Sequence, residues 1–290
     1  MSKNTTTLRV MGVPEHFNTP WILAIDDGAF DEIGVNVEFT DAPGGTGEMS
    51  QALFHNNTDM ALLLTEGALN SVLTGNPCTI HSTYVDSPLL WGVFAGGQTE
   101  TETAALRNAP FLVSRFYSGS HLMGFMYADH HKRTVTRDDF TEVGNADGAV
   151  KALAEQPDRL FLWEKYISMP LVKKKKLRLV DTFSATWPAF VAVVRNDYLA
   201  EHHALVDKVL AVVREYAADL EESGEEGAEL VAHLYDLKVK HAEEWMAQVH
   251  FSRTGAVDLD HLREAAGTLH RLGILKTLPD TAALNAVIAG

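Results

Sequence analysis

The sequence predicts an α/β protein made of two doubly wound sheets, followed by a purely helical C-terminal region. Short apolar runs typical of strands alternate with helical patterns from residue 8 to residue 194. Strands separated by single helices imply parallel pairing through right-handed crossovers. A polar segment rich in Gly, Thr and Glu at 96–108 interrupts this alternation, and it indicates a surface connection near a boundary between two lobes.

The expected strands are short and either alternating or continuously apolar. The run at 60–64 is apolar throughout, as in parallel strands that are buried on both faces. The run at 35–39 alternates apolar and polar residues, which is typical of a half-buried strand. The full set of expected strands is 8–13, 35–39, 60–64, 78–85, 89–95, 111–113, 140–143, 160–163, 177–182 and 189–194.

Helices are expected between these strands and throughout the C-terminal region. Pro20 suits the first turn of a helix because its φ is fixed near the helical value. The other helices of this part are expected after the glycine-rich turn at 43–47, at 65–73, from Ser120, at 147–156 and near Ile167. From Asn196 onward we expect one helix that ends at Gly224, a second that carries Leu230 to Trp245, and a third between Asp258 and Gly273.

Composition excludes several classes of protein. The chain has 290 residues, of which 46% are hydrophobic and 22% charged, and this length allows two ordinary domains or one bilobed unit. A formal net charge of -15 argues against a nucleic-acid surface, and the run Lys173–Lys176 is expected to be a solvated edge. The single cysteine, Cys78, excludes an intramolecular disulfide and a cysteine-rich metal site. We expect no metal ion.

The first seven residues bear on the cellular location of the protein. The segment 1–7 is polar and no apolar h-region follows it, which predicts a cytoplasmic protein without a secretory signal. A mature periplasmic protein whose leader had been removed would have the same sequence. No run approaches the 18 apolar residues that a membrane span needs, so no membrane span is expected.

The segment 111–125 is a candidate anion-binding site. It predicts a buried strand at 111–113, a polar loop at 114–118 and a helix that begins at Gly119 or Ser120. The free amides of a helix start carry partial positive charge, and Ser114, Ser118 and Ser120 add hydroxyl groups. The alternative is that Ser118 or Ser120 only caps the helix.

Other loops at the expected carboxyl ends of strands carry side chains suited to ligand recognition. Open α/β sheets bind ligands at these ends. Aromatic side chains can sandwich a planar ligand, while Glu, Ser and Thr bind its edges. The loop residues are His16, Phe17, Gly44 to Gly47, Thr65, Glu66, Tyr84, Asp86, Ser87, Ser114, Arg115, Ser118 to Ser120, Trp163, Glu164 and Trp187.

Six motifs in this order resemble the type II periplasmic-binding-protein fold. They are VPEHFNTP (13–20), GTG (45–47), LTEG (64–67), TYVDSP (83–88), SRFYSGS (114–120) and WE (163–164). The chain is similar to the branch that contains thiamin-pyrimidine synthases and the sulfonate- or pyrimidine-binding proteins of ABC importers. It is most similar to the Ca3427-like substrate-binding domains.

This resemblance implies two α/β lobes that close around a ligand by a hinge motion. The first lobe would comprise 1–95 and 190–290, the second 96–189, and the chain would cross between them near 93–98 and 184–190. The resemblance implies no cofactor and no catalytic residue. The ligand-binding residues that we expect are His16, Thr46, Thr65, Glu66, Tyr84, Ser114, Arg115, Ser118, Gly119, Ser120, Trp163, Glu164 and Trp187.

The chain departs from the thiamin-pyrimidine synthases at two points. Their pyridoxal-phosphate lysine aligns with Asn57, whose amide cannot form a Schiff base. Their cysteine-rich iron motif is missing, because Cys78 is the only cysteine. We therefore expect the self-consuming chemistry of those enzymes to be absent.

Several interpretations of single residues stay open. Arg115 could pair with a ligand carboxylate or sulfonate, or it could turn outward to solvent. Glu66 and Glu164 could act as acid and base, although carboxylates in such a cleft more often accept N–H groups of a ligand. The pairs His130–His131 and His202–His203 lack the spacing of a zinc site.

The function we expect is binding of a small planar polar or anionic metabolite between the lobes. A thiamin-precursor-like pyrimidine is the first candidate, and aromatic carboxylates or sulfonates are others. The alternatives are an enzyme of thiamin or menaquinone biosynthesis on the same fold, and a substrate-binding subunit of an ABC importer. A permease partner is expected only if the protein is exported.

Overall fold

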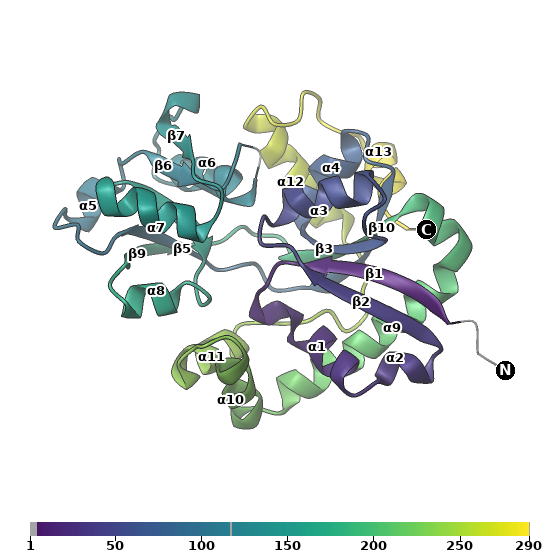
Figure 1. Cartoon of the computed structure of the whole chain (residues 1–290). Helices are drawn as coiled ribbons and strands as arrows, with labels where there is room; N and C mark the ends of the chain where they lie inside the picture. Colours follow the sequence, from purple (N-terminus) through teal and green to yellow (C-terminus); the bar gives the residue numbers. More distant parts are fainter. Residues whose placement is uncertain (1–4, 117, 290) are drawn as a thin grey trace.

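Two α/β lobes lie side by side, each built around its own five-stranded sheet (Figure 1). The computed structural model describes residues 5–116 and 118–289. Within these ranges, no helix is both long enough and apolar enough to span a bilayer. Tyr117, which belongs to the predicted polar loop, lies outside the described residues.

The first sheet has the strand order β2-β1-β3-β10-β4. Its strands are β1 (Thr6–Gly12), β2 (Val35–Asp41), β3 (Met60–Leu64), β4 (Cys78–Val85) and β10 (Phe190–Arg195). Strand β1 runs parallel to β2 and β3, whereas β10 is antiparallel to both of its neighbours. The helices that connect or flank these strands are η1 (His16–Asn18), α1 (Thr19–Asp26), α2 (Ala29–Glu32), α3 (Thr46–Phe54) and α4 (Thr65–Leu73).

The second sheet has the order β7-β6-β8-β5-β9, with β5 antiparallel to β8 and β9. Its strands are β5 (Trp91–Gly96), β6 (Phe111–Val113), β7 (Phe140–Glu142), β8 (Leu160–Glu164) and β9 (Leu177–Phe183). Its helices are α5 (Thr103–Leu106), α6 (Gly119–His130), η2 (Arg137–Asp139), α7 (Ala146–Glu155) and α8 (Met169–Lys173). The polar segment 96–108 thus contains the short helix α5.

The C-terminal region is helical, as predicted, but its division differs from the prediction. It comprises α9 (Asn196–Glu222), α10 (Glu225–Leu234), α11 (Val239–Met246), α12 (Leu259–Arg271) and α13 (Thr281–Ala286). The single helix expected from Leu230 to Trp245 is broken between α10 and α11, where Asp236 adopts a positive φ of 52°. Asp258 caps α12 by accepting a hydrogen bond from the amide of Asp260, and Gly273 follows it with a φ of 73°.

Each sheet is mostly parallel, as the alternation of strands and helices implied. One strand of each sheet, β10 in the first and β5 in the second, inserts antiparallel between two neighbours. The chain passes from the first sheet to the second between Val85 and Trp91, and it returns between Phe183 and Phe190. The division of the chain into lobes at 95 and 190 stays a prediction.

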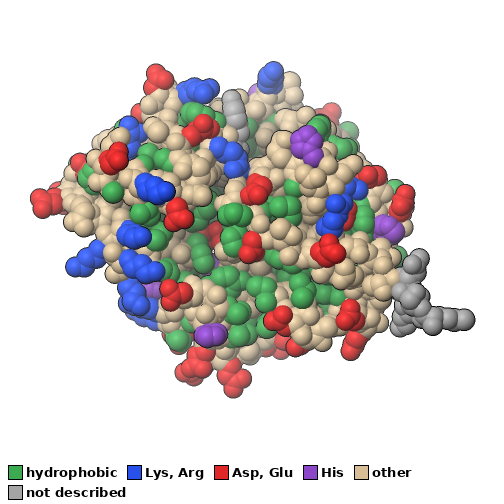
Figure 2. Space-filling model, viewed as in Figure 1, with side chains coloured by type: hydrophobic (Ala, Val, Ile, Leu, Met, Phe, Trp, Pro, Cys, Tyr) green, Lys and Arg blue, Asp and Glu red, His purple; other side chains and the backbone are tan. Residues whose placement is uncertain are grey.

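The surface is predominantly acidic but not uniformly so. On the face shown in Figure 2, Lys and Arg gather mainly over the second lobe, while Asp and Glu are spread over both lobes. The run Lys173–Lys176 is fully exposed at the end of α8 and in the turn to β9. Its four charges therefore face solvent, where they repel each other little and contact no partner within the described chain.

Candidate functional site

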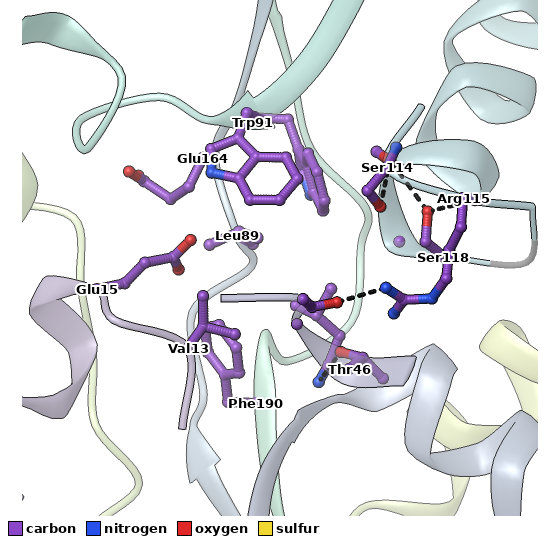
Figure 3. Close-up of a pocket in the computed structure, with 16 residues that line it drawn as sticks. Val13, Glu15, Thr46, Leu89, Trp91, Ser114, Arg115, Ser118, Glu164 and Phe190 are labelled. Atoms are coloured by element: carbon purple, nitrogen blue, oxygen red, sulfur yellow. Dashed lines mark hydrogen bonds between the residues drawn. The ribbon is translucent and has the colours of Figure 1, made fainter. Parts of the chain in front are cut away.

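A cleft between the lobes is lined by the ends of strands and the loops that follow them (Figure 3). Its cavity volume is about 50 Å³, and it is open to bulk solvent on one side. The first lobe contributes the segments after β1 and β2, and the second contributes the segment after β6 and the end of β8. The lining residues are Val13, Glu15, Gly44, Gly45, Thr46, Leu64, Leu89, Trp91, Ser114, Arg115, Ser118, Gly119, Ser120, Trp163, Glu164 and Phe190.

One end of the cleft is formed by three serines at the start of α6. The Ser120 hydroxyl accepts a hydrogen bond from the Ser114 amide at 3.0 Å and lies 3.0 Å from the Ser118 hydroxyl. Ser118 is the N-cap residue, but its hydroxyl is 3.4 Å from the amide of His121, at the long limit of a hydrogen bond. The cap and the cleft-lining position coexist, so the two readings of this loop do not exclude each other.

The same end of the cleft receives a second helix start, from the other lobe. Helix α3 begins at Thr46, directly after Gly44 and Gly45. The first turn of an α-helix leaves its amides without partners in the helix. The starts of α3 and α6 therefore face the same space from opposite lobes with partial positive charge. Glu48, in the first turn of α3, accepts a hydrogen bond from the Gly44 amide at 2.6 Å and offsets part of this charge.

Arg115 joins the two lobes across this end. Its Nη1 donates a hydrogen bond to the carbonyl oxygen of Gly44 at 2.5 Å. Desolvation lowers the pKa of its guanidinium from the ordinary value, although Glu48 and Glu142 act in the opposite direction. Arg115 is thus half-buried and turns toward the first lobe, and its remaining N–H groups lie beside the cleft (Figure 3).

Gly47→Ala is expected to break the hydrogen bond by which Arg115 joins the two lobes. A Cβ at Gly47 would overlap with the guanidinium of Arg115, whose Nε would lie 2.6 Å away. Because the end of an arginine side chain is flexible, the guanidinium should move and lose its bond to Gly44 while the fold persists. We expect a larger radius of gyration by small-angle X-ray scattering, with a melting temperature close to that of the wild type.

Gly267→Ala is the matched control for this variant. Gly267 also lies within a helix, α12, but a Cβ there would meet nothing within 4 Å. Both substitutions should favour their helices by up to about 1 kcal/mol. An unchanged radius of gyration in both variants would show that Arg115 does not hold the lobes together.

The opposite end of the cleft is acidic. Glu15 precedes η1 and Glu164 ends β8. Both side chains lie at the end of the cleft that is away from the three serines (Figure 3). They are 7% and 2% exposed. The Glu164 Oε2 accepts a hydrogen bond from the amide of Ile167 at 2.6 Å, and its Oε1 has no hydrogen-bond partner among the described residues.

His16 lies behind this end and is fully buried among aromatic rings. Its ring centroid is 4.3 Å from that of Trp245 in α11, and the rings of Phe17, Tyr166 and Tyr235 also surround it. Burial lowers the pKa of His16 to about 3, so the imidazole is neutral near pH 7. Its Nε2 is 3.8 Å from Glu164 Oε1, but a neutral imidazole at this distance makes no salt bridge.

Burial also favours the neutral form of the two carboxyls. It raises the pKa of Glu15 to about 8. It raises the pKa of Glu164 well above the ordinary value, and the nearby Glu15 raises it further. The hydrogen bond from Ile167 opposes this shift without cancelling it. At neutral pH the acidic end therefore holds at least one proton that a cation could displace.

Aromatic side chains form the walls between the two ends. Trp91 of β5 and Phe190 of β10 lie on opposite sides of the space in Figure 3. Trp163 is partly exposed and stacks on Phe161 at a centroid distance of 5.4 Å and an interplanar angle of 16°. Faces of this kind bind planar or apolar parts of a ligand.

Most of the residues predicted from the sequence line this cleft, but some lie behind it. Those that line it are Thr46, Ser114, Arg115, Ser118, Gly119, Ser120, Trp163 and Glu164. Those that do not are His16, Thr65, Glu66, Tyr84 and Trp187. No ligand tests their roles, so the binding role of each residue stays a prediction.

The residues behind the cleft make buried hydrogen bonds that support its walls. The Trp187 indole donates to Glu66 Oε2 at 2.9 Å, and the Thr65 hydroxyl donates to the carbonyl of Pro188 at 2.6 Å. The Tyr84 hydroxyl donates to the carbonyl of Phe17 at 2.5 Å. These bonds tie α4 to the segment that returns from the second lobe, and η1 to β4.

Sequence reasoning missed Glu15 and Trp91 as cleft residues. Glu15 lies inside the VPEHFNTP motif, from which only His16 is predicted to bind the ligand. Trp91 lies in the expected strand 89–95 and is only 5% exposed. The signal that could have identified Glu15 is a carboxylate in the loop that follows a buried parallel strand.

Neither a family model nor a curated protein matches the sequence. Solved structures do match. The CA3427 gene product of Candida albicans, described as defining a new family with the generic periplasmic binding protein fold, is 26% identical over 98% of this chain and 96% of its own, with a TM-score of 0.89. The chain has the periplasmic-binding-protein fold.

More distant structures of this fold come from ABC importers and related systems. The alkanesulfonate-binding protein SsuA of Xanthomonas axonopodis, bound to MOPS, is 13% identical over 98% of both chains, with a TM-score of 0.77. The periplasmic nitrate-binding protein NrtA of Synechocystis is 13% identical over 98% of this chain and 85% of its own, with a TM-score of 0.70. At 13% identity these two structures share the fold alone with this chain.

Proposed function

We propose that this protein binds a small organic anion in the cleft between its lobes, with the charged group at the serine end. The observation that carries the proposal is the meeting of two helix starts, α3 and α6, from opposite lobes at one end of an aromatic cleft. A ligand anion there would gain amide, hydroxyl and guanidinium donors from both lobes. Such a ligand would favour the closed arrangement of the lobes.

The ligand class that fits best is a planar ring with a carboxylate, sulfonate or phosphate group. A thiamin-precursor-like pyrimidine belongs to this class, as do aromatic carboxylates and sulfonates. Two structural neighbours are described as binding sulfonate or nitrate, which are also anions. At 13% identity they share the fold alone, so the proposal rests on the cleft of this chain.

Ser118→Ala with Ser120→Ala is expected to weaken binding of aromatic sulfonates and carboxylates at least tenfold. Each hydrogen bond to a charged group is worth about 1.5–3 kcal/mol. The measurement is isothermal titration calorimetry with a panel of pyrimidines, aromatic carboxylates and aromatic sulfonates. The free energy of unfolding should fall by about 1 kcal/mol for the lost helix cap. It should fall further because the buried Ser114 amide loses its acceptor, Ser120.

Asn145→Ala provides the matched control. Asn145 caps α7 in the same lobe, where its side chain accepts a hydrogen bond from the Gly148 amide at 3.0 Å, and it does not line the cleft. This variant should lower the free energy of unfolding by about 1 kcal/mol, the cost of a lost helix cap, and it should leave binding unchanged. Failure of the whole panel to bind the wild type, or equal affinities for the serine variant and wild type, would contradict the proposal.

An enzyme on the same fold is the second candidate, and the protonated carboxyls at the acidic end favour it. A carboxylic acid that is neutral at pH 7 can serve as a general acid. This candidate predicts that a bound ligand is converted to a product and that Glu15→Gln and Glu164→Gln stop the conversion.

A permease partner and a periplasmic location are further proposals, and they would be tested by locating the native protein in fractionated cells.

A further inference from the structure

We propose that the ligand is dipolar, with a protonated nitrogen held between Glu15 and Glu164 and its anionic group at the serine end. This inference rests on the proposed function and specifies the ligand class further. It also predicts that capture of the ligand releases a proton from the carboxyl pair. An amine, an amidine or a protonated aminopyrimidine would each supply the nitrogen.

The cleft has two chemically different ends, as Figure 3 shows. Ser114, Ser118 and Arg115 lie at one end and Glu15 and Glu164 at the other, with Trp91 and Phe190 between them. A ligand with anionic groups at both ends would place one of them against two carboxyls. A ligand with opposite charges at its ends would match both.

The acidic end lacks the partners that buried carboxyls usually have. Glu164 Oε1 is buried without a hydrogen bond, and the described residues make no hydrogen bond to the Glu15 carboxyl. Among these residues, no Lys or Arg nitrogen lies within 4 Å of either carboxyl, since Lys165 pairs with Glu244 of α11 at 3.9 Å. Buried carboxyls without partners are costly, so a donor brought by the ligand would be strongly favoured.

The nearby side chains of the described residues offer no cation that hydrogen-bonds to the Glu15 or Glu164 carboxyl. His16 is the nearest titratable nitrogen, and its aromatic cage keeps it neutral. Tyr166 bonds to Gln248 at 2.8 Å, and Trp245 closes the far side. The C-terminal helices α10 and α11 therefore wall off the acidic end from solvent and leave the cleft as its open side.

Binding of a cation should couple to proton release. The pKa of Glu15 is raised to about 8 and that of Glu164 is raised further by the presence of Glu15. A cation beside them favours the ionised form and lowers both pKa values. At pH 7 the pair should therefore release up to about one proton when the ligand binds.

The test compares probes that differ only by an ammonium group. The aromatic pair is 4-(aminomethyl)benzenesulfonate and 4-methylbenzenesulfonate, and the smaller pair is 2-aminoethanesulfonate and ethanesulfonate. For at least one pair we expect the amine to bind about tenfold more tightly or better. Calorimetry at pH 7 in buffers with different enthalpies of ionisation should show proton release with the amine and none with its partner.

Variants assign the effect to the carboxyl pair. Glu15→Gln and Glu164→Gln should each reduce the preference for the amine to less than about threefold and remove the proton release. Glu221→Gln is the control, because Glu221 is a mostly buried carboxylate of α9 that pairs with Arg253 at 2.7 Å and does not line the cleft. Circular dichroism and melting temperatures establish that each variant is folded.

The outcomes separate this inference from the proposed function. If the amine-free probes bind as tightly as their amines, or the carboxyl variants keep the full preference, the dipolar ligand is excluded and the anion site stands. If no sulfonate of either pair binds the wild type, the anion site fails and this inference fails with it. If only the amines bind and the serine variant does not weaken them, the nitrogen site stands and the anion site is excluded.

Discussion

Trp187→Ala is expected to lower the free energy of unfolding by about 3–5 kcal/mol, the usual cost of truncating a buried tryptophan. Trp187 is 2% exposed and lies in the segment by which the chain returns from the second lobe to the first. Its loss leaves a cavity, and it also leaves Glu66 without its indole donor. Guanidinium denaturation followed by far-UV circular dichroism measures the change.

Trp187→Phe separates the hydrogen bond from the packing. Phenylalanine keeps much of the ring volume but cannot donate to Glu66, which is 4% exposed. An unsatisfied buried acceptor costs about 1–3 kcal/mol, so this variant should fall between the wild type and Trp187→Ala. Burial raises the pKa of Glu66 and the hydrogen bond from Trp187 opposes this shift, so Trp187→Phe should raise that pKa further. A variant as stable as the wild type would show that this hydrogen bond contributes nothing.

Glu15→Gln is expected to stabilise the ligand-free protein at alkaline pH and to flatten its stability profile. A carboxyl whose pKa is raised by folding holds its proton more tightly in the folded state. Its contribution is fully present below the ordinary pKa of 4.5 and is lost as pH rises through about 8. At 1.36 kcal/mol per unit, a displacement of this size corresponds to about 5 kcal/mol for an isolated group.

The measurement is the free energy of unfolding between pH 5 and pH 9 in the absence of ligand. Wild type should lose stability over this range, and Glu15→Gln should lose much less because glutamine cannot ionise. Glu164 shifts in the same direction, so some slope should remain in the single variant. Glu221→Gln should keep the slope of the wild type. Equal slopes in wild type and Glu15→Gln would mean that Glu15 ionises in the folded protein as easily as in the unfolded chain.

The strands were the part of the fold most predictable from the sequence. Met60–Leu64 and Phe111–Val113 were predicted with the bounds observed, because continuous apolar runs between turn residues admit few alternatives. Cys78–Val85, which mixes apolar and polar residues, was also predicted with its observed bounds. The antiparallel insertion of β10 was not predictable in this way. All residues of Phe190–Arg195 are buried, and a strand buried on both faces has the same local pattern in either direction.

The candidate site was predictable to the level of loops but not of side chains. Loops that follow strands of one sheet meet at one edge, so the motifs marked the correct segments. Which of two adjacent residues faces the cleft depends on backbone angles set by tertiary packing. Glu15 and His16 illustrate this, since the first lines the cleft and the second is caged by Trp245, a residue far along the chain.

The return of β10 to the first sheet, after β5 to β9 have formed the second, affects how the protein can be synthesised and folded. In the first sheet β3 and β4 do not pair with each other, and β10 fills the space between them. A nascent chain must therefore extend to Arg195 before its first sheet can be completed, although four of the five strands have emerged by Val85. Until then the edges of β3 and β4 are open to other chains. Pairings of such large sequence separation form slowly, so premature release or truncation before β10 would favour aggregation over a folded half.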